Sequence, residues 1–314
     1  MTTRVVAWLL LASLCCPAAF AELLQGDGVA VEYAPRDEAV ARDTLSTIED
    51  SIEEFSNHLP SGSDPIHVVI CSTPEEFARY AGPYSEFGAI GVTKSGSGTI
   101  AVRPPRLQRL EVDYRGLLRH ELIHILLERN TDPLNMPRWF EEGICMVVSG
   151  ERRLSNSLQM AQMYLRNQVI EYPALDYAFF APRSPDEFGD AYIQSYSMTK
   201  YLMKRLGEKR FWELVAALGN TSFADALKEK AGLDPAGLWA AWRRSLWKIA
   251  IVSSLVSGFG VFQFMAILCI VAYLRKRQRK RRIERQWAEE DGEFLTVWDL
   301  EGTEPPLPWE EDDG

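Results

Sequence analysis

The chain has 314 residues, a formal net charge of −10 at neutral pH, and 46% hydrophobic and 25% charged residues. This composition is typical of a globular protein with enough length for one or two domains and a sizeable core. The acidic balance argues against a nucleic-acid binder, which would carry a basic face.

The first 21 residues have the layout of a secretory signal peptide. Arg4 supplies a positive head, residues 5–14 form an apolar run, and residues 19–21 read Ala-Phe-Ala, a small-x-small cleavage site. The apolar run is too short to cross a bilayer comfortably. We therefore expect the mature chain to begin at Glu22, with an uncleaved anchor as the alternative.

Residues 22–110 are predicted to form a small α/β layer. Apolar residues at helical spacing alternate there with short β-branched runs. The last of these runs form a hairpin, which could offer an edge strand to an extended peptide or be only a hairpin. The expected elements are helices at 38–58 and 73–80, a strand at 66–70, and a hairpin of 89–93 with 99–102.

Residues 111–247 are predicted to be mainly helical, so the fold class is α+β. Asp113 can cap the first helix, and Pro137 can start the second. A loop is expected at 182–189. The predicted helices run over 113–129, 137–148, 155–169, 190–206, 209–218, 223–231 and 235–247.

One stretch of the first of these helices carries chemistry. Residues 120–124 read His-Glu-Leu-Ile-His. His120 and His124 are four apart and share a helix face, so both imidazoles can reach one metal ion. Glu121 is rotated away from them and can accept a proton without binding the metal. The alternative is a pair of buried histidines that are satisfied by hydrogen bonds.

The next helix can supply a third ligand. A catalytic zinc site takes three protein ligands and keeps one position open. Residues 137–143 read Pro-Arg-Trp-Phe-Glu-Glu-Gly, and a turn after His124 lets this segment fold back toward the histidines. Glu141 and Glu142 point about 100° apart on a helix, so only one of them can face the metal.

The HELIH and PRWFEEG segments together resemble the gluzincin metallopeptidases, and most closely the peptidase MA-like domains of bacterial envelope proteins. The resemblance covers roughly residues 64–247 and includes Ala-Tyr-Ile-Gln-Ser-Tyr at 191–196. It implies a zincin-like helical part and one zinc ion per chain. It also implies that the Glu before Gly in W-x-x-E-G, here Glu142, is the third ligand, which leaves Glu141 as a neighbour. No third histidine follows as in metzincins.

The resemblance implies a peptidase that acts on proteins or peptides, with Glu121 as the general base. Gluzincins often use a downstream Tyr or His to stabilise the oxyanion, and Tyr192 and Tyr196 are the candidates. We prefer Tyr192, although packing in the core is the alternative for both. The competing function is a catalytically silent binding or assembly module of the cell envelope. The oligomeric state stays open.

Two cysteines remain in the expected mature domain, Cys71 and Cys145. They could form a disulfide in an exported protein or be two separate buried thiols. Neither lies at a sequence spacing that is typical of a metal site.

The C-terminal part is predicted to anchor the protein. Residues 249–274 are uncharged and apolar, which suits a transmembrane helix. The basic run at 275–282 is expected to stay in the cytoplasm, so residues 22–248 would lie on the periplasmic side of the inner membrane. Residues 275–314 form a basic, then acidic tail, which we expect to be disordered from residue 287 onward.

Overall fold

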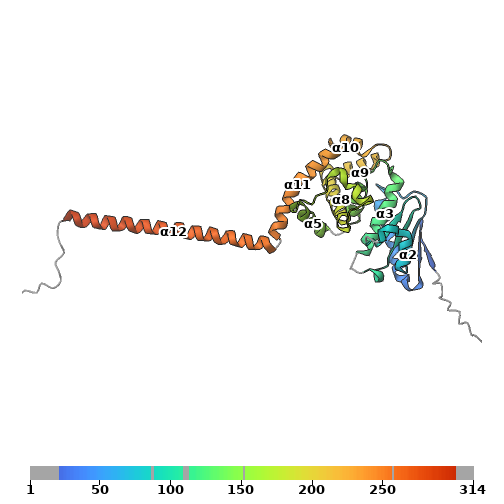
Figure 1. Cartoon of the computed structure of the whole chain (residues 1–314), viewed down its shortest axis with the longest axis horizontal. Coiled ribbons are helices and arrows are strands. Elements are labelled where there is room, and N and C mark those ends of the chain that lie inside the picture. Colours follow the sequence, from blue (N-terminus) through green and yellow to red (C-terminus); the bar gives the residue numbers. More distant parts are fainter. Residues whose placement is uncertain (1–20, 86–87, 109–112, 151–152, 257, 302–314) are drawn as a thin grey trace, which may run out of the picture. The chain divides into compact units, whose positions relative to one another are not determined.

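A computed structural model describes residues 21–85, 88–108, 113–150, 153–256 and 258–301 (Figure 1). The predicted signal peptide lies outside these residues, apart from residue 21. The chain divides into two units, Met1–Ala250 and Ile251–Gly314, which are described separately.

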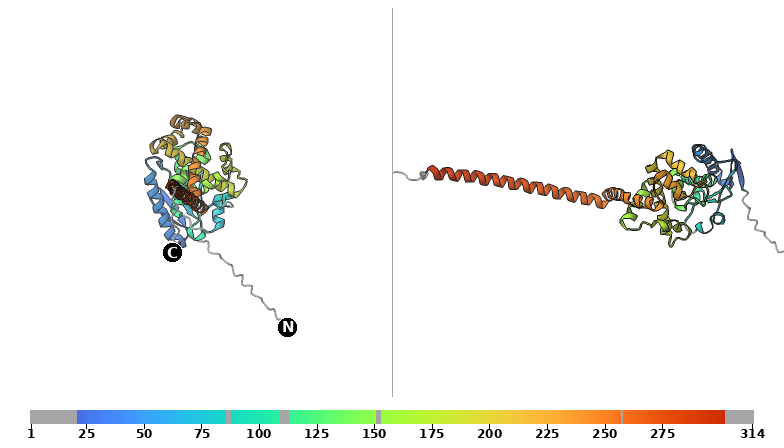
Figure 2. Two further views of the ribbon diagram at one scale, coloured as in Figure 1. Left: turned by 90° about the vertical axis from the view of Figure 1, so that its left-hand side faces the viewer. Right: turned by 90° about the horizontal axis from the view of Figure 1, so that it is seen from above.

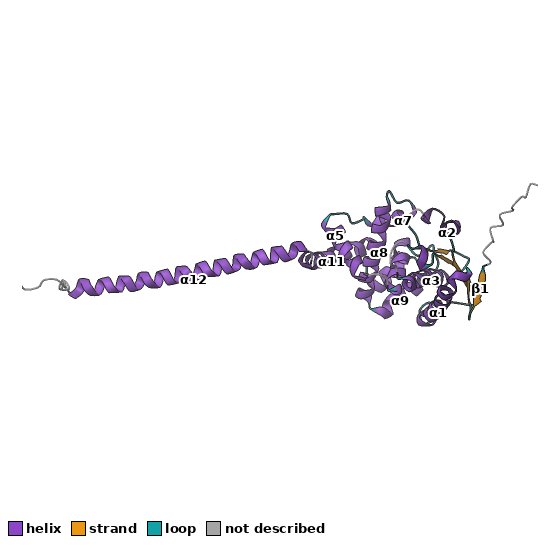
Figure 3. Cartoon of the chain, turned by 90° about the horizontal axis from the view of Figure 1, so that it is seen from below, coloured by secondary structure: helices purple, strands orange, loops and turns teal. Residues whose placement is uncertain are grey.

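The first unit contains one mixed sheet of five strands, in the order β1-β2-β3-β5-β4. The central pairs β2–β3 and β3–β5 are parallel, and the outer pairs β1–β2 and β5–β4 are antiparallel. In Figure 3 these strands lie together beside α1 and α3. The strands are β1 (Glu22–Gln25), β2 (Val29–Tyr33), β3 (Ile66–Ile70), β4 (Gly91–Lys94) and β5 (Thr99–Val102).

The sheet is covered on both faces because its strands alternate between two apolar clusters. Val68 of β3 and Ile100 of β5 point into the main core with α1 (Glu38–Phe55) and α3 (Tyr114–Asn130). Val69 and Ala101 point the other way, against α2 (Pro74–Ala81). Burial on both faces explains why β3 is an almost unbroken run of apolar residues.

The remainder of the first unit is helical. Figure 2 shows this part in green to orange and the α/β layer in blue and cyan. Short 3₁₀ turns η1 (Pro35–Asp37), η2 (Gly82–Ser85) and η3 (Pro105–Leu107) lie in the α/β layer. The helices are α4 (Arg138–Ser149), α5 (Arg153–Leu165), α6 (Tyr172–Leu175), α7 (Tyr177–Phe180), α8 (Pro185–Leu206), α9 (Glu208–Ala217), α10 (Phe223–Ala231) and α11 (Pro235–Val256).

A glycine sets the packing of α4 against α8. A Cβ atom on Gly143 would lie 2.1 Å from Thr199 Oγ1 and 2.6 Å from the backbone oxygen of Ser195. Only glycine lets the two helices approach this closely, since any side chain would collide with the α8 backbone. The Gly of W-x-x-E-G therefore fixes the position of the glutamates that precede it.

The structure confirms a small α/β layer followed by a helical part. Thr73 and Asp113 cap α2 and α3 by accepting hydrogen bonds from Glu76 N and Gly116 N, as predicted. Three expectations were wrong or incomplete. The strands β1 and β2 were missed, and α8 begins at Pro185 inside the predicted loop, with Ser184 as its N-cap.

The third correction concerns the tail, in the second unit. Helix α12 (Gly258–Glu301) runs through residues 287–301, which were expected to be disordered. Residues 302–314 lie outside the described part. None of the helices in the part that the structure describes is both long and apolar enough to cross a membrane. The predicted span at 249–274 is therefore not supported; residue 257 and the side chains of 252–260 lie outside the description.

Candidate metal centre

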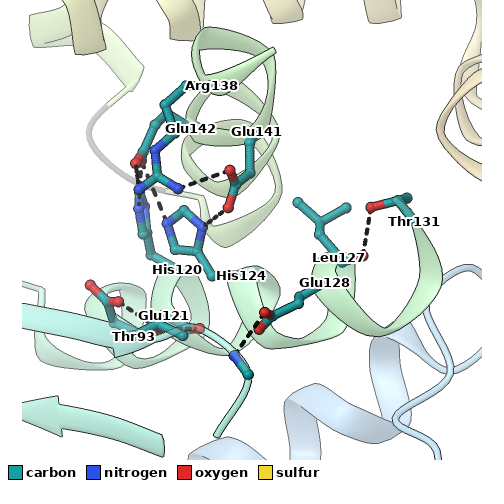
Figure 4. Close-up of polar contacts among 11 residues, drawn as sticks. Thr93, His120, Glu121, His124, Leu127, Glu128, Thr131, Arg138, Glu141 and Glu142 are labelled. Atoms are coloured by element: carbon teal, nitrogen blue, oxygen red, sulfur yellow. Dashed lines mark hydrogen bonds and ion pairs between the residues drawn. The ribbon is translucent and has the colours of Figure 1, made fainter. Parts of the chain in front are cut away.

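Helix α3 brings three ionisable side chains into the interior. His120, Glu121 and His124 are exposed by only 7%, 6% and 8%. Their helix is buried on both sides of this stripe, because its apolar residues pack into the main core. Figure 4 shows both imidazoles directed toward α4. Groups of this kind are costly to bury unless other groups satisfy them.

Helix α4 directs the carboxylate of Glu142 at the two histidines. Glu142 Oε2 lies 3.3 Å from His120 Nε2 and 3.5 Å from His124 Nε2 (Figure 4). Glu142 is 1% exposed, and its Oε2 atom has no hydrogen-bond partner among the described residues. Three donor atoms therefore converge on one point.

These separations fit a shared metal ion better than hydrogen bonds. Ligand atoms at about 2.1 Å from a tetrahedral zinc lie roughly 3.4 Å apart. Hydrogen bonds between nitrogen and oxygen are usually shorter, at about 2.7–3.2 Å. The observed 3.3 and 3.5 Å thus match the spacing of ligands around an ion. The residues present fit a zinc ion.

Arg138 fixes the rotamer of Glu142. Its Nη2 lies 2.6 Å from Glu142 Oε1, while its Nη1 donates to Glu141 Oε2 at 2.8 Å. The guanidinium of Arg138 thus holds the carboxylates of Glu141 and Glu142, which lie one turn further along α4. Because Oε1 of Glu142 is engaged by the arginine, Oε2 is the oxygen that remains for a metal ion.

Glu141 has a role that the sequence did not reveal. Its Oε1 lies 2.7 Å from His124 Nδ1, on the side of the ring opposite Nε2. Carboxylates that bind the second nitrogen of a metal-binding histidine fix its tautomer and orientation. The expectation that Glu141 is only a neighbour of the third ligand did not include this contact with His124.

Glu121 is held by the edge strand of the sheet. Thr93 Oγ1 on β4 donates to Glu121 Oε2 at 2.8 Å and also lies 2.9 Å from the Glu121 backbone oxygen. A Cβ atom on Gly91 of β4 would lie 2.8 Å from Glu121 Oε1. The strand thus positions the carboxylate through one hydroxyl and leaves room for it through one glycine.

The two candidate tyrosines of α8 lie in different surroundings. Tyr192 lines the cavity in front of the histidines. Tyr196 is 3% exposed and receives a hydrogen bond from Lys200 Nζ at 3.1 Å. Burial, and then the charge of Glu142, raise the pKa of Tyr192 well above its ordinary value, so this phenol is protonated at neutral pH.

Cys145 also belongs to the centre, contrary to what its sequence spacing indicates. One donor atom each from His120, His124 and Cys145 lies within 4.8 Å of the other two. Sequence spacing missed this thiol because it reaches the histidines from another helix. Both Cys71 and Cys145 are free and buried, so the structure contains no disulfide between them.

The charged groups of this centre shift one another's pKa values. Burial by itself lowers the pKa of His124, but the neighbouring Cys145 and Glu142 raise it well above the ordinary value. Burial raises the pKa of Glu142, yet Arg138 and His124 hold it well below its usual range. Metal binding to such a cluster would be coupled to the release of protons from its ligands.

The centre opens into a cavity of about 770 Å³. The five residues of the preferred site line it, namely His120, Glu121, His124, Glu142 and Tyr192, whereas the alternative candidate Tyr196 does not. Three aromatic residues, Phe179, Phe180 and Phe188, also line the cavity, and so do residues 91–93 of β4. A cavity of this size is typical of sites that take small ligands or short peptide segments.

The family model described as "Peptidase MA superfamily" matches residues 63–248, which include the centre and all of its walls. No curated protein matches the chain.

Proposed function

The chain belongs to the Peptidase MA superfamily, and on that basis we propose that it is a zinc-dependent peptidase of the gluzincin type. The observation that carries the proposal is the convergence of Glu142 Oε2 on the Nε2 atoms of His120 and His124 at ligand spacing. These three residues would hold one zinc ion per chain. When bound, the ion would supply Lewis-acid chemistry.

The chain's own residues would carry the proton transfers. Glu121 takes a proton from the attacking water and returns it to the nitrogen of the leaving amine, so the amide bond breaks with one water consumed. Thr93 holds Oε2 of this carboxylate in place. Tyr192 is protonated at neutral pH and donates a hydrogen bond to the oxyanion that develops on the substrate.

The substrate is proposed to be an extended peptide that lies along β4. This strand ends the sheet, since β5 pairs with it on one side only. Its residues 91–93 line the cavity beside Glu121. A peptide that adds to this edge would gain backbone hydrogen bonds. The aromatic lining of Phe179, Phe180 and Phe188 favours a large apolar side chain beside the cleaved bond.

Export of the domain is a further part of the proposal. Its support is the signal-peptide pattern of residues 1–21. Protease digestion of intact spheroplasts tests it: residues 22–248 should be cut without lysis. Protection of that part would place the domain in the cytoplasm.

A second candidate function is a catalytically silent binding module. One observation favours it: Cys145 lies in the donor group, and a fourth protein ligand would close the site to water. The presence of Glu121 favours the enzyme, because a metal-holding scaffold needs no base beside the metal.

Metal analysis of the purified full chain tests the proposed function. The wild type should retain one zinc per chain, and His120→Ala, His124→Ala and Glu142→Gln should each lose it. Glu128→Gln is the matched control, because Glu128 lines the same cavity on the same helix but accepts from Gly96 N at 2.8 Å. A wild type that contains no metal after purification without chelator overturns the proposal.

A further inference from the structure

We propose that Cys145 is a fourth protein ligand, which closes the metal centre in the resting protein and must leave before the site can act. The inference rests on the proposed zinc site of His120, His124 and Glu142. It assigns a sulfur donor that neither the sequence motifs nor their spacing indicate.

The register of α4 places the thiol beside the third ligand. Glu142 and Cys145 are three residues apart, and such residues share a helix face. Cys145 has no exposed surface, and its sulfur lies within 4.8 Å of a donor atom of each histidine. One helix thus directs an oxygen and a sulfur at the pair of imidazoles on α3.

The separation lies within reach of coordination. Around a tetrahedral zinc, with a Zn–S bond of about 2.3 Å and a Zn–N bond of about 2.1 Å, sulfur and nitrogen lie roughly 3.6 Å apart. The donor atoms of His120, His124 and Cys145 lie within 4.8 Å of one another, at most about an ångström beyond this spacing. A small shift of one side chain closes the difference.

Cys71 shows what a thiol with only a packing role looks like in this fold. It is equally buried, but it lies among Val69, Phe77 and Ala81, and its sulfur donates a hydrogen bond to the backbone oxygen of Val69 at 3.9 Å. Cys145 instead lies beside two imidazoles, and both imidazoles also face Glu142 Oε2, which lacks a hydrogen-bond partner among the described residues. The two thiols differ in surroundings, and the chain supplies its own control.

The consequence is a latent site. Catalytic zinc sites keep one position open, whereas four protein ligands are typical of closed, structural sites. With Cys145 coordinated, no position remains for a water or a substrate carbonyl. Activity would then depend on displacement of the thiol, and removal of the thiol would relieve the block.

Cobalt(II) titration of the full chain tests the inference, because thiolate ligands give cobalt a charge-transfer band in the near ultraviolet that nitrogen and oxygen ligands do not. The wild type and Cys71→Ser should show the band. Cys145→Ala and Cys145→Ser should bind cobalt without it, with unchanged far-ultraviolet circular dichroism. If the thiol occupies the fourth position in nine-tenths of the molecules, peptide hydrolysis by the zinc forms of both variants should rise about tenfold.

Each of the other possible results of this experiment contradicts one specific part of the inference. A wild type that binds cobalt without the band overturns ligation by Cys145 and leaves the three-ligand site standing. A band that is lost in the Cys145 variants without any gain in hydrolysis overturns the latency. A wild type that binds no cobalt overturns the proposed function, and this inference with it.

Discussion

Helices α3 and α8 both place polar side chains in the interior, and they satisfy them in different ways. On α8, Gln194 is fully buried and its amide pairs with the backbone of Ile170, donating to the oxygen at 2.7 Å and accepting from the nitrogen at 2.9 Å. On α3, His120 and His124 meet the side chain of Glu142 instead.

This difference in partners distinguishes a polar side chain with a structural role from side chains that can form a functional site. The Gln194 amide accepts from Ile170 N and donates to Ile170 O and Met198 Sδ, so nothing is left for a ligand. The groups that α3 presents are ionisable, converge from two helices and lie at ligand spacing. A buried polar residue in a helix is thus no evidence of function until its partners are known.

The largest effect should come from Glu121→Gln. The amide keeps the shape of the side chain but cannot take a proton, so hydrolysis should fall about 10²–10⁴-fold, the usual contribution of general acid–base catalysis. The metal content should stay at the wild-type value because the three ligands remain. Parallel measurement of zinc and peptide hydrolysis checks this. A variant that loses zinc would make Glu121 a ligand.

A smaller effect is expected from Glu141→Gln. The neutral amide binds His124 Nδ1 less strongly than the carboxylate, and the loss of such outer partners typically costs about 10–100-fold in metal affinity. Competition with a chelator gives the affinity, with Glu128→Gln as control. An unchanged affinity would restore the original expectation that Glu141 is only a neighbour.

The α8 side of the comparison is tested by Gln194→Leu. This change removes the acceptor for the nitrogen of Ile170 and one of the two donors to its oxygen, which keeps its hydrogen bond from Trp239 Nε1 at 3.2 Å. The loss should lower the free energy of unfolding by about 1–3 kcal/mol. Urea denaturation measures the loss. Zinc affinity of the folded variant should not change. A folded variant that binds zinc weakly would contradict the separation between structural group and site.

Much of this site could be predicted from the sequence because its motif lies within one helix. The spacing of His120 and His124 depends only on helical geometry, and Asp113 and Pro137 mark where the two helices begin. The strand β3 was equally clear, since burial on both faces produces a continuous apolar run. Local rules determine these features.

The remainder depends on contacts between distant segments. The contact of Glu141 with His124 requires the crossing of α3 and α4, and that crossing depends on Gly143 against α8. The place of Cys145 follows from the same packing. The strands β1 and β2 were missed because both are short. β1 pairs with its neighbour in the chain, β2, but β2 joins the sheet through β3, which follows only after α1.

The smallest predicted effect lies on the outer face of α3. Arg119 makes a two-pronged pair with Glu54 of α1, at 2.6 and 2.8 Å, and this hydrogen bonding lowers the pKa of Glu54. A lowered folded-state pKa means that the pair stabilises the fold above the unfolded pKa, near 4.5, and that this stability is lost as the pH falls through the folded pKa. Glu54 is half exposed, so solvent limits the contribution to about 0.2–1 kcal/mol.

Urea denaturation of Glu54→Gln measures this contribution. The variant should be slightly less stable than the wild type at neutral pH, and equally stable in acid well below the folded pKa. The control Glu53→Gln, which changes the exposed neighbour, should show no such trend. A deficit of the same size in acid would mean that Glu54 acts by packing and not by charge.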